Sequence, residues 1–503
     1  MQSHAQFRDS SAVLMVRGQG SALEVFLVRR ADSLRFFGGY WALPGGVVDP
    51  GDGDPERDEE GAFRWCAARE LFEETGVLLA DLEVDWSADE RDRERRGLID
   101  SPGSEAWQRI QGEIEYLESL THLGLMRTPA FAPVRYGTHF FGLELPSGEE
   151  PGVIPGELSH GEFVRPSDAL HQWRKGERLI VPPVRTLLEF LEASLQTPFG
   201  WRHFVARTPA RLESFEEGEL PPILNSPGVF MLPQSTPTLP PATTTNTYLV
   251  GHESFYLVDP ATPHETDQNA LVAFIRRIVT DGKVLAGILL THEHGDHVGA
   301  VARMQAEFGV PVYAHAETLA RLPEPSRDTV ALVDRQRLDL GAAPDGTPDW
   351  FLEAVHTPGH AVGHMVFRES RYGAVLGGDM ASTVSTIVIE PPEGHLRTYL
   401  ESLEIVHELG PGMFYPAHGP AAIDGQKLMR KYQKHRAERE QQLMAALRES
   451  GPATIKALVP VVYADAPKQA HSMAEHSLLA GLIKLQEEGR ATESEGRWTL
   501  VGN

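Results

Sequence analysis

Residues 291–299 read Thr-His-Glu-His-Gly-Asp-His-Val-Gly, and the rest of the chain can be interpreted from them. The apolar run directly before this stretch predicts a buried strand. His292 and His294 are two positions apart, so in an extended chain their side chains point to the same side and can share one metal ion. Asp296 and His297 follow closely enough to reach a second ion. Imidazole and carboxylate together suit zinc, with iron or manganese as alternatives.

Three more candidate ligands follow downstream, each at the end of an apolar run. His360 ends the segment Thr-Pro-Gly-His, Asp379 ends Val-Leu-Gly-Gly-Asp, and His418 lies in Phe-Tyr-Pro-Ala-His-Gly. The simpler alternative is a strand-to-helix loop that is rich in histidine without a function. The ordered series of downstream ligands favours a metal site over that alternative.

This series resembles the metallo-beta-lactamase superfamily, which implies an αββα sandwich. By that resemblance the ligands bind two ions: His292, His294 and His360 one, Asp296, His297 and His418 the other, with Asp379 as the bridge. Two cations about 3.5–4 Å apart lower the pKa of a bridging water to near neutrality and polarise the scissile group. The resemblance therefore implies two zinc ions and a bridging hydroxide as the nucleophile, with Asp296 among the catalytic residues.

Composition narrows the class of protein. The chain has 503 residues, too many for one compact core, and 41% of them are hydrophobic, as in ordinary globular proteins. A net charge of −25 disfavours a general binder of nucleic acid or anionic membranes. The single cysteine, Cys66, excludes an intramolecular disulfide. Because no apolar run resembles a signal peptide or is long enough to cross a bilayer, we expect a cytoplasmic protein without a membrane partner.

A second group of acidic residues lies on a helix predicted from about Gly61 to Thr75. Glu70, Glu73 and Glu74 are spaced i, i+3, i+4 and share one face of that helix. Three carboxylates on one face repel one another unless a divalent cation neutralises them, and oxygen ligands suit Mg²⁺. Taken alone, a solvated acidic helix face is an equal alternative.

The flanking residues resemble the Nudix hydrolase box, with Leu-Pro-Gly-Gly at residues 43–46, Arg-Glu at residues 69–70 and Gly76 after the helix. The resemblance implies an α/β/α fold and a site that binds Mg²⁺ or Mn²⁺. It also implies four catalytic residues: Arg69, Glu70, Glu73 and Glu74.

The box departs from the family pattern in its length. Arg69 comes 23 positions after Gly46, about nine more than the pattern allows. Counting back from Arg69, the first glutamate of the box would fall on Gly61. That glutamate is therefore missing or displaced, and the candidates for its place are Asp52, Glu59 and Glu60.

The region after the box looks like the coenzyme A diphosphatase-like branch of the Nudix family. Its features are a strand rich in aromatic residues within residues 133–141 and a Pro-Pro pair ahead of a helix predicted for residues 184–195. Glu157 is either an additional acidic ligand or base, or an ordinary surface glutamate.

The order of these features predicts a multidomain protein of the α/β and α+β classes. We expect a Nudix domain at residues 1–200, a linker at 201–220, a metallo-beta-lactamase domain at 221–422 and a helical winged-helix domain at 423–503. The last two resemble the beta-lactamase-like branch near glyoxalase II, whose members include endoribonucleases and thioesterases acting on carrier-bound acyl chains. Because the charges of the tail are mixed, a packing or lid role is favoured over nucleic-acid binding.

Between His297 and His418, five other histidines lie outside the ligand series. His364, four positions after His360, is expected to orient a ligand. The remaining four are expected to be structural or exposed: His315, His356, His395 and His407.

Three hypotheses about function remain open. The first is a hydrolase with two sites, one cleaving an ester or thioester and one cleaving a pyrophosphate. The small-molecule substrates are then an acyl thioester and a nucleoside diphosphate derivative, and coenzyme A derivatives contain both a thioester and a pyrophosphate. The second is an endoribonuclease with an accessory Nudix domain, which the acidic charge disfavours. The third is a zinc hydrolase with a catalytically silent Nudix module. The sequence does not indicate the oligomeric state.

Overall fold

The computed structural model describes residues 7–34, 36–53, 55, 58–80, 87–100, 105–132, 134–280, 282–323 and 326–502. The chain divides into two compact units, Met1–Pro227 and Gly228–Asn503, which are described one after the other. Among the described residues, no helix combines the length and the apolar character that a membrane span requires.

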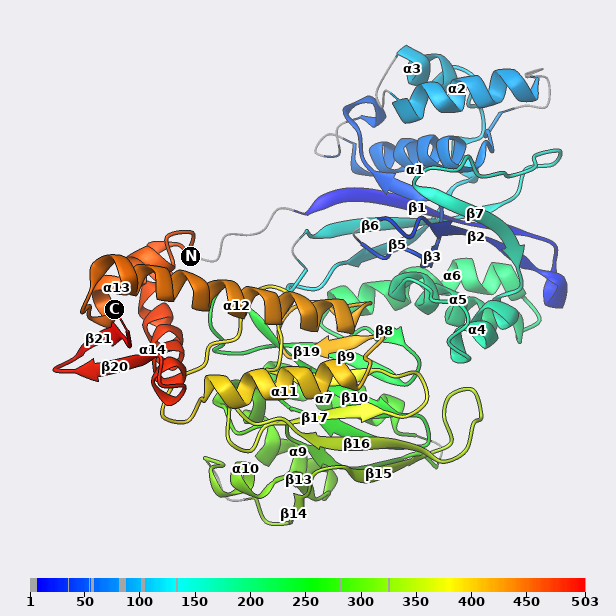
Figure 1. Cartoon of the computed structure of the whole chain (residues 1–503). Coiled ribbons are helices and arrows are strands. Elements are labelled where there is room, and N and C mark those ends of the chain that lie inside the picture. Colours follow the sequence, from blue (N-terminus) through cyan, green and yellow to red (C-terminus); the bar gives the residue numbers. More distant parts are fainter. Residues whose placement is uncertain are drawn as a thin grey trace. The chain divides into compact units, whose positions relative to one another are not determined.

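The first unit has helices on both faces of a mixed sheet (Figure 1). The strand order is β3 (Trp41–Ala42), β2 (Glu24–Arg30), β1 (Arg8–Arg17), β6 (Tyr136–Glu144) and β5 (Thr121–Arg127). Two further strands join it, β4 (Gly45–Val47) on β1 and β7 (Leu158–Val164) on β2. The centre of β1 is fully buried because it pairs in parallel with β6 along its whole length. This is the expected α/β/α fold of a Nudix domain.

One helix of this unit carries the predicted acidic group. It is α1 (Glu59–Thr75), which ends at Gly76 in the left-handed conformation with φ 78°. Glycine adopts this conformation without steric cost and is the preferred residue after a helix. On the same side of the sheet lie α2 (Ala88–Asp100) and α3 (Glu105–Gln111), and on the other side lie α4 (Pro166–Arg174) and α5 (Pro182–Leu195) (Figure 1).

The region expected to be a linker contains a helix. Residues 200–216 form α6 (Gly200–Glu216), which packs against β5 and α5. Its buried residues are Phe204, Thr208 and Leu212. A linker was expected at residues 201–220, and most of this stretch instead forms helix α6. Strand β8 (Ile223–Ser226) then ends the first unit.

The second unit contains two large sheets. The first has the order β14 (Thr329–Leu332), β13 (Val312–His315), β12 (Val284–Leu289), β11 (Ser254–Val258), β10 (Thr244–Gly251) and β9 (Val229–Ser235). The second has the order β15 (Gln336–Gly341), β16 (Trp350–His356), β17 (Met365–Glu369), β18 (Val375–Gly378) and β19 (Phe414–Pro416).

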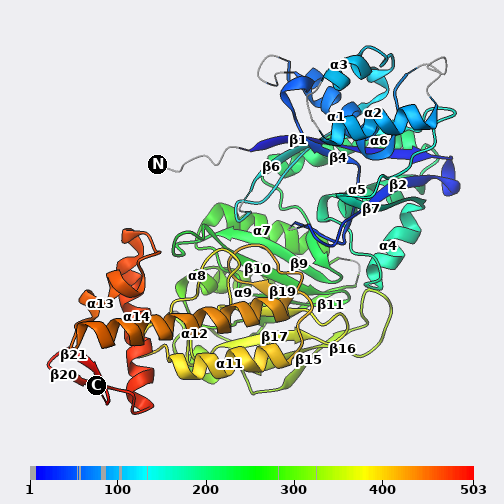
Figure 2. The same cartoon turned by 45° about the horizontal axis from the view of Figure 1, so that its top comes forward.

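Helices cover both sheets, which gives the expected αββα arrangement. The first sheet is accompanied by α7 (Glu265–Ile278), α8 (Gly295–Val298), α9 (Val301–Phe308) and α10 (Ala316–Ala320). The second is covered by α11 (Leu396–Glu408) and α12 (Gly425–Ser450), which run side by side (Figure 2). Tyr399 and Leu403 of α11 and Met429 of α12 share one hydrophobic core with Val355 and Val375 of the second sheet.

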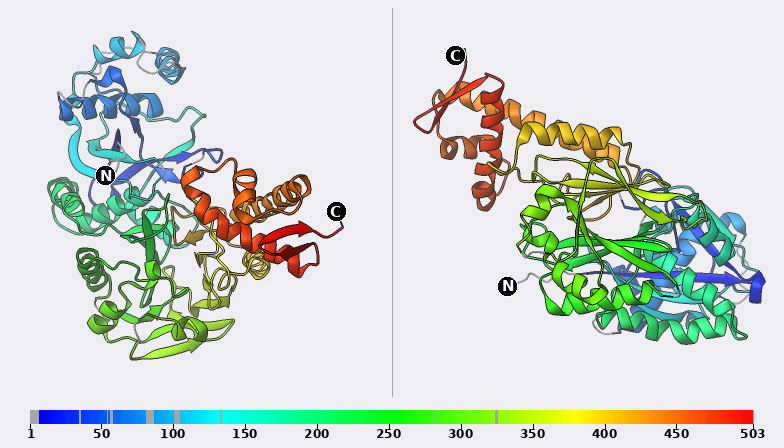
Figure 3. Two further views of the ribbon diagram at one scale, coloured as in Figure 1. Left: turned by 90° about the vertical axis from the view of Figure 1, so that its left-hand side faces the viewer. Right: turned by 90° about the horizontal axis from the view of Figure 1, so that it is seen from below.

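The C-terminal part, where a winged-helix domain was expected, has three helices and a hairpin. After α12 come α13 (Ile455–Val462), α14 (His471–Glu487), β20 (Ala491–Ser494) and β21 (Arg497–Leu500), with the hairpin drawn in red in Figure 3. A separate core joins Leu447 of α12, Leu458 of α13, Leu482 of α14 and Trp498 of the hairpin. This arrangement is a winged helix.

Candidate metal centres

The seven predicted ligands of the second unit meet at the ends of the strands that precede them. Strand β12 runs into residues 290–297, and β18 and β19 are parallel neighbours whose ends carry Asp379 and His418. Three groups have ligand atoms within 4.8 Å of one another: His292, His294 and His360; His292, His297 and Asp379; and Asp296, His297 and His418. The groups share members, so together they form one centre with room for two ions.

Asp379 faces both halves of this centre. Its Oδ2 lies 3.4 Å from Nε2 of His360, and its Oδ1 lies 3.4 Å from Nε2 of His418 and 3.7 Å from Nε2 of His297. On the other side, Nδ1 of His294 lies 3.0 Å from Nε2 of His292 and 3.1 Å from Nε2 of His360. Asp379 thus lies between His360 on one side and His297 and His418 on the other.

Four of the histidine rings are held by a hydrogen bond at Nδ1. The partners are Thr291 Oγ1 for His292 (3.0 Å), Asp259 Oδ2 for His297 (2.9 Å), Val388 O for His360 (3.0 Å) and Thr244 O for His418 (3.1 Å). A carbonyl or carboxylate at Nδ1 keeps the proton there and leaves the lone pair on Nε2, the nitrogen that points into the centre. His294 is turned the other way and presents Nδ1.

Two buried atoms at the centre have no hydrogen-bond partner within the described part of the chain. They are Nε2 of His297 and Oδ1 of Asp379. A buried polar atom without a partner is costly, and a bound cation removes that cost for both atoms. The residues therefore fit a metal centre of imidazole and carboxylate ligands.

The electrostatics of the centre depend on burial and on neighbouring charges. Burial and the surrounding histidines hold the pKa of His292 well below its usual value. Burial also lowers the pKa of His297, but the hydrogen bond and charge of Asp259 outweigh it and raise that pKa to about 10. Burial raises the pKa of Asp379. The neighbouring histidines, His418 above all, lower it by a larger amount, so the pKa of Asp379 lies well below the usual range. The low pKa values of His292 and Asp379 favour the neutral imidazole and the charged carboxylate, which are the forms that bind a cation.

Asp259 is a supporting residue that no sequence motif indicated. This buried residue follows β11 with φ 47° and accepts hydrogen bonds from the backbone N–H (2.8 Å) and Oγ1 (2.7 Å) of Thr291. It therefore fixes both the start of the ligand loop and the ring of His297. The signal in the sequence was its place directly after an apolar strand, the same place that three recognised ligands occupy.

His364 lies where it was expected, among the groups that support a ligand. Its Nε2 accepts the backbone N–H of Asp379 (3.1 Å), and its Nδ1 lies 2.9 Å from Thr357 Oγ1. His315 and His356 stack on each other at 4.2 Å between ring centroids, outside the centre. His395 lies 2.9 Å from Glu487, and His407 lies half-buried on α11.

The acidic residues of the first unit are arranged around Arg69 on α1. The Arg69 side chain is buried, and its Nη1 donates to Glu70 (2.8 Å) and Glu73 (3.3 Å). Glu74 accepts the backbone N–H of Gly45 at 2.8 Å. The carboxylate oxygens of Glu70, Glu73 and Glu74 do not all lie within 4.8 Å of one another. Arg69 therefore positions two of the carboxylates, and the trio is close together without forming a tight cage.

The structure identifies a partner for Arg69 from the lengthened loop. Asp52 is buried and accepts from Nε (2.9 Å) and Nη2 (2.9 Å) of Arg69. Glu60 instead pairs with Arg64 at the surface, and the side chain of Glu59 lies outside the described set. Of the described candidates, Asp52 alone pairs with Arg69.

Burial raises the pKa of the carboxyl groups of Glu70, Glu73 and Glu74. Burial, opposed by Arg69 and assisted by the charge of Glu73, raises the pKa of Glu70 to about 7. Burial and the charge of Glu70 raise the pKa of Glu74 well above its usual value. Glu157 is exposed, and its charge contributes to the raised pKa of Glu73. A divalent cation would favour the charged forms of all three box carboxylates.

Arg95 is a second residue that the sequence analysis did not identify. It comes from α2 and donates to the carbonyls of Glu73 (3.2 Å), Glu74 (2.9 Å) and Gly152 (2.8 Å). The last carbonyls of a helix have no partners within the helix, and a cation there also suits the helix dipole. Arg95 therefore caps the end of α1 that carries the acidic group.

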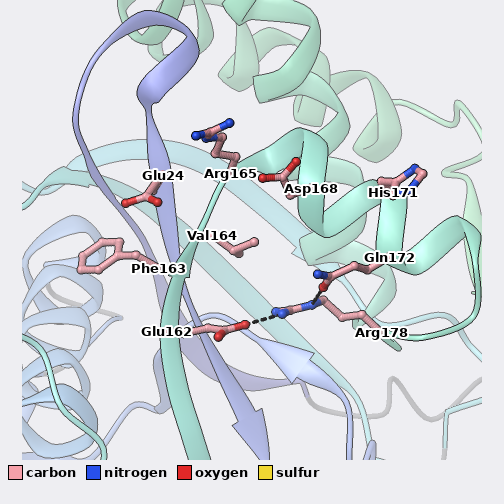
Figure 4. A pocket seen from close by; sticks show the side chains of 9 residues that line it. All are labelled: Glu24, Glu162, Phe163, Val164, Arg165, Asp168, His171, Gln172 and Arg178. Atoms are coloured by element: carbon pink, nitrogen blue, oxygen red, sulfur yellow. Dashed lines mark hydrogen bonds and ion pairs between the residues drawn. The ribbon is translucent and has the colours of Figure 1, made fainter.

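A cavity of about 410 Å³ lies elsewhere in the first unit (Figure 4). It is lined by residues of β2, β7, α4 and the loop after α4: Glu24, Glu162, Phe163, Val164, Arg165, Asp168, His171, Gln172 and Arg178. Arg178 is fixed at its wall by hydrogen bonds to Glu162 and Gln172. None of the residues of the Nudix-like box lines this cavity.

Three segments of the chain match known protein families. Residues 6–182 match the NUDIX domain, residues 240–418 match the Metallo-beta-lactamase superfamily, and residues 454–498 match the Beta-lactamase associated winged helix domain. These matches agree with the resemblances noted in the sequence and with the order of the units.

Known proteins of fungi and animals resemble the second half of the chain. Atrochrysone carboxyl ACP thioesterase of Aspergillus chevalieri is 32% identical over 275 residues, which are 52% of this chain and 82% of that protein. Beta-lactamase-like protein 2 homolog of Caenorhabditis elegans is 28% identical over 253 residues, 49% of this chain and 79% of that protein.

Solved structures resemble each unit. A NUDIX hydrolase from Alicyclobacillus acidocaldarius is 27% identical, covers 39% of this chain and 98% of its own, and has a TM-score of 0.34. A metallo-beta-lactamase family protein from Thermus thermophilus is 24% identical, covers 54% of this chain and 98% of its own, and has a TM-score of 0.46.

Proposed function

The chain belongs to the metallo-beta-lactamase superfamily and carries a Nudix domain ahead of that part, and we propose that it is a hydrolase. We propose further that its second unit cleaves thioesters at a two-metal centre. The observation that carries the proposal is the convergence of seven ligands with Asp379 facing both halves. Two zinc ions would, when bound, supply an activated water as nucleophile and polarise the scissile carbonyl. Iron and manganese fit the same ligands.

The protein's own residues prepare the centre. The hydrogen bonds at Nδ1 of His292, His297 and His360 hold each ring in one orientation before any ion or substrate arrives. A site that is organised in advance does not have to be reorganised during the reaction. Thr291 and Asp259 connect two of these rings, so hydrogen bonds tie the first ligand loop to the residue after β11.

Thioesters are favoured over RNA on the basis of charge and of one relative. RNA binding requires several cations that pair with phosphates, whereas this chain has a net charge of −25. A thioester needs few charges, and a relative with 32% identity is named a thioesterase. We infer that the substrate is a small acyl thioester, free or bound to a carrier.

For the first unit we propose magnesium-dependent cleavage of a pyrophosphate in a nucleoside diphosphate derivative. Glu70, Glu73 and Glu74 would hold Mg²⁺ or Mn²⁺, and Arg69 would position them. A coenzyme A thioester contains both a thioester and a pyrophosphate, so one class of molecule would serve both units. Glu157 is close enough to influence Glu73 and is the candidate for an additional base.

A second candidate function for the first unit is ligand binding without catalysis. Arg69 donates to Glu70 and Glu73, and the three carboxylates do not form a tight cage. Both facts are compatible with a unit that binds a nucleotide derivative and leaves it intact. The two candidates differ in whether the ligand is cleaved when Mg²⁺ is present.

The experiment that tests the proposal is a comparison of substrates with product identification. The purified chain is assayed with acyl-coenzyme A esters of several chain lengths and with an unstructured RNA, alongside His360→Ala. We expect thioester hydrolysis that is lost in His360→Ala, and kcat/KM on the best thioester above that on RNA. Zinc-dependent RNA cleavage without thioester hydrolysis would overturn the proposal.

A further inference from the structure

One segment without a helix or strand, residues 382–393, touches ligands of both halves of the metal centre. Oγ of Ser382 donates to the carbonyl of His418 at 3.1 Å, and the carbonyl of Val388 holds Nδ1 of His360 at 3.0 Å. We call residues 382–393 the orienting segment. Because the orienting segment belongs to no helix or sheet, its conformation depends on the side chains that bind its backbone.

The first support is Tyr432, which is buried on α12. Its hydroxyl accepts the backbone N–H of Ser382 at 2.7 Å and shares its own proton between the carbonyls of Ser382 (3.0 Å) and Ser385 (2.8 Å). One hydroxyl thus satisfies three backbone groups of the orienting segment. Removing the oxygen would leave these groups without that partner in a buried place.

The second support is Arg436, one turn further along the same face of α12. Its guanidinium donates to the carbonyl of Ile387, directly before Val388, and lies 5.2 Å from the ring centre of Tyr399. The hydroxyl of Tyr399 in turn donates to the carbonyl of Met380 at 2.7 Å. Arg436 therefore acts next to the carbonyl that orients His360, and it contacts Tyr399, which binds the residue that follows Asp379.

Helix α14 of the winged helix adds contacts at the far end of the segment. Nδ1 of His476 lies 3.1 Å from Glu390, and Glu487 binds His395 and Arg397, which follow the segment. Figure 2 shows how α12 runs from the second sheet into the winged helix. The supports of the orienting segment therefore come from the C-terminal helices.

We propose that Tyr432 and Arg436 are positioning residues for the metal centre, acting through the orienting segment on His360 and His418. This inference rests on the proposed two-metal centre. By this means the helix that leads into the winged helix contributes to metal affinity without supplying a ligand. Groups that orient ligands typically change metal affinity by about 10- to 100-fold when they are removed.

The test uses the full chain and two conservative changes, Tyr432→Phe and Arg436→Lys. The chain offers matched controls in Tyr463→Phe and Arg439→Lys, because Arg439 lies 4.8 Å from the ring of Tyr463 and binds Val462 and Asp465 instead of the orienting segment. Zn²⁺ affinity and stoichiometry are measured by competition with a chromophoric chelator, and the absorption spectrum of the Co²⁺-loaded protein reports ligand geometry.

We expect at least one ion to bind about 10-fold or more weakly in Tyr432→Phe and Arg436→Lys, with an altered Co²⁺ spectrum, while both controls match the wild type. On a thioester, kcat should fall more than KM rises. Wild-type affinity and spectrum in both test variants would overturn the inference, and so would equal weakening in the controls. Because these readouts need no substrate, they separate this inference from the proposed thioesterase activity, which fails only if the fully loaded wild type does not hydrolyse thioesters.

Discussion

At the scale of single residues, substitutions of different candidate ligands in the second unit should differ in how many bound ions they remove. His360 belongs to one half of the centre, whereas Asp379 faces both halves. His360→Ala should therefore lose about one ion per chain, and Asp379→Asn should weaken the binding of both. Elemental analysis after purification without chelator measures the change. An active wild type without bound transition metal would contradict the proposed centre.

In the first unit, we expect both stability and activity to depend on the ion pair between Asp52 and Arg69. Removing the charge of Asp52 takes away one of the three carboxylate partners of the buried Arg69 guanidinium, and breaking a buried ion pair typically costs about 3–5 kcal/mol. Asp52→Asn should lower the melting temperature and reduce pyrophosphate cleavage at least tenfold. Asp58→Asn, at the exposed N-terminus of the same helix, is the control, because asparagine caps a helix as well as aspartate does. Equal activity in the two variants would mean that Asp52 does not position Arg69.

At the scale of elements, α2 acts as a cap for α1. Arg95 satisfies the carbonyls of two of the acidic residues, and hydrogen bonds to a charged group contribute about 1.5–3 kcal/mol each. Arg95→Met should lower stability by about 2 kcal/mol and should reduce magnesium-dependent turnover, because the end of α1 loses its anchor. Thermal unfolding and steady-state kinetics measure the two effects. The exposed neighbour Arg96 provides the control Arg96→Met, which should leave both quantities unchanged.

At the scale of the whole molecule, the two sites belong to separate compact units. Glu73→Gln and Glu74→Gln should abolish magnesium-dependent pyrophosphate cleavage and leave thioester hydrolysis nearly unchanged. The reciprocal change, His360→Ala, should do the opposite. Both activities are measured on the same preparations. A loss of both activities in a folded Glu73→Gln protein would show that the two units do not work independently.

Much of the fold was predictable because its signals are local. The apolar runs before His292, Asp379 and His418 predicted strands, and the i, i+3, i+4 spacing of the glutamates predicted one helix face. In the first unit, α1 ended at the predicted Gly76. The prediction failed at α6, where proline and glycine signals suggested a linker although packing against β5 favours a helix.

The sequence by itself determined the ligand types, their order and the strands that carry them, because side-chain chemistry and backbone periodicity act over a few residues. The tertiary structure decided which distant residues support those ligands. Asp52 meets Arg69 across 17 positions, Asp259 meets Thr291 across 32, and Tyr432 meets Ser382 across 50. Such contacts leave no periodic trace in the chain, since they arise only when packed elements bring the two partners together.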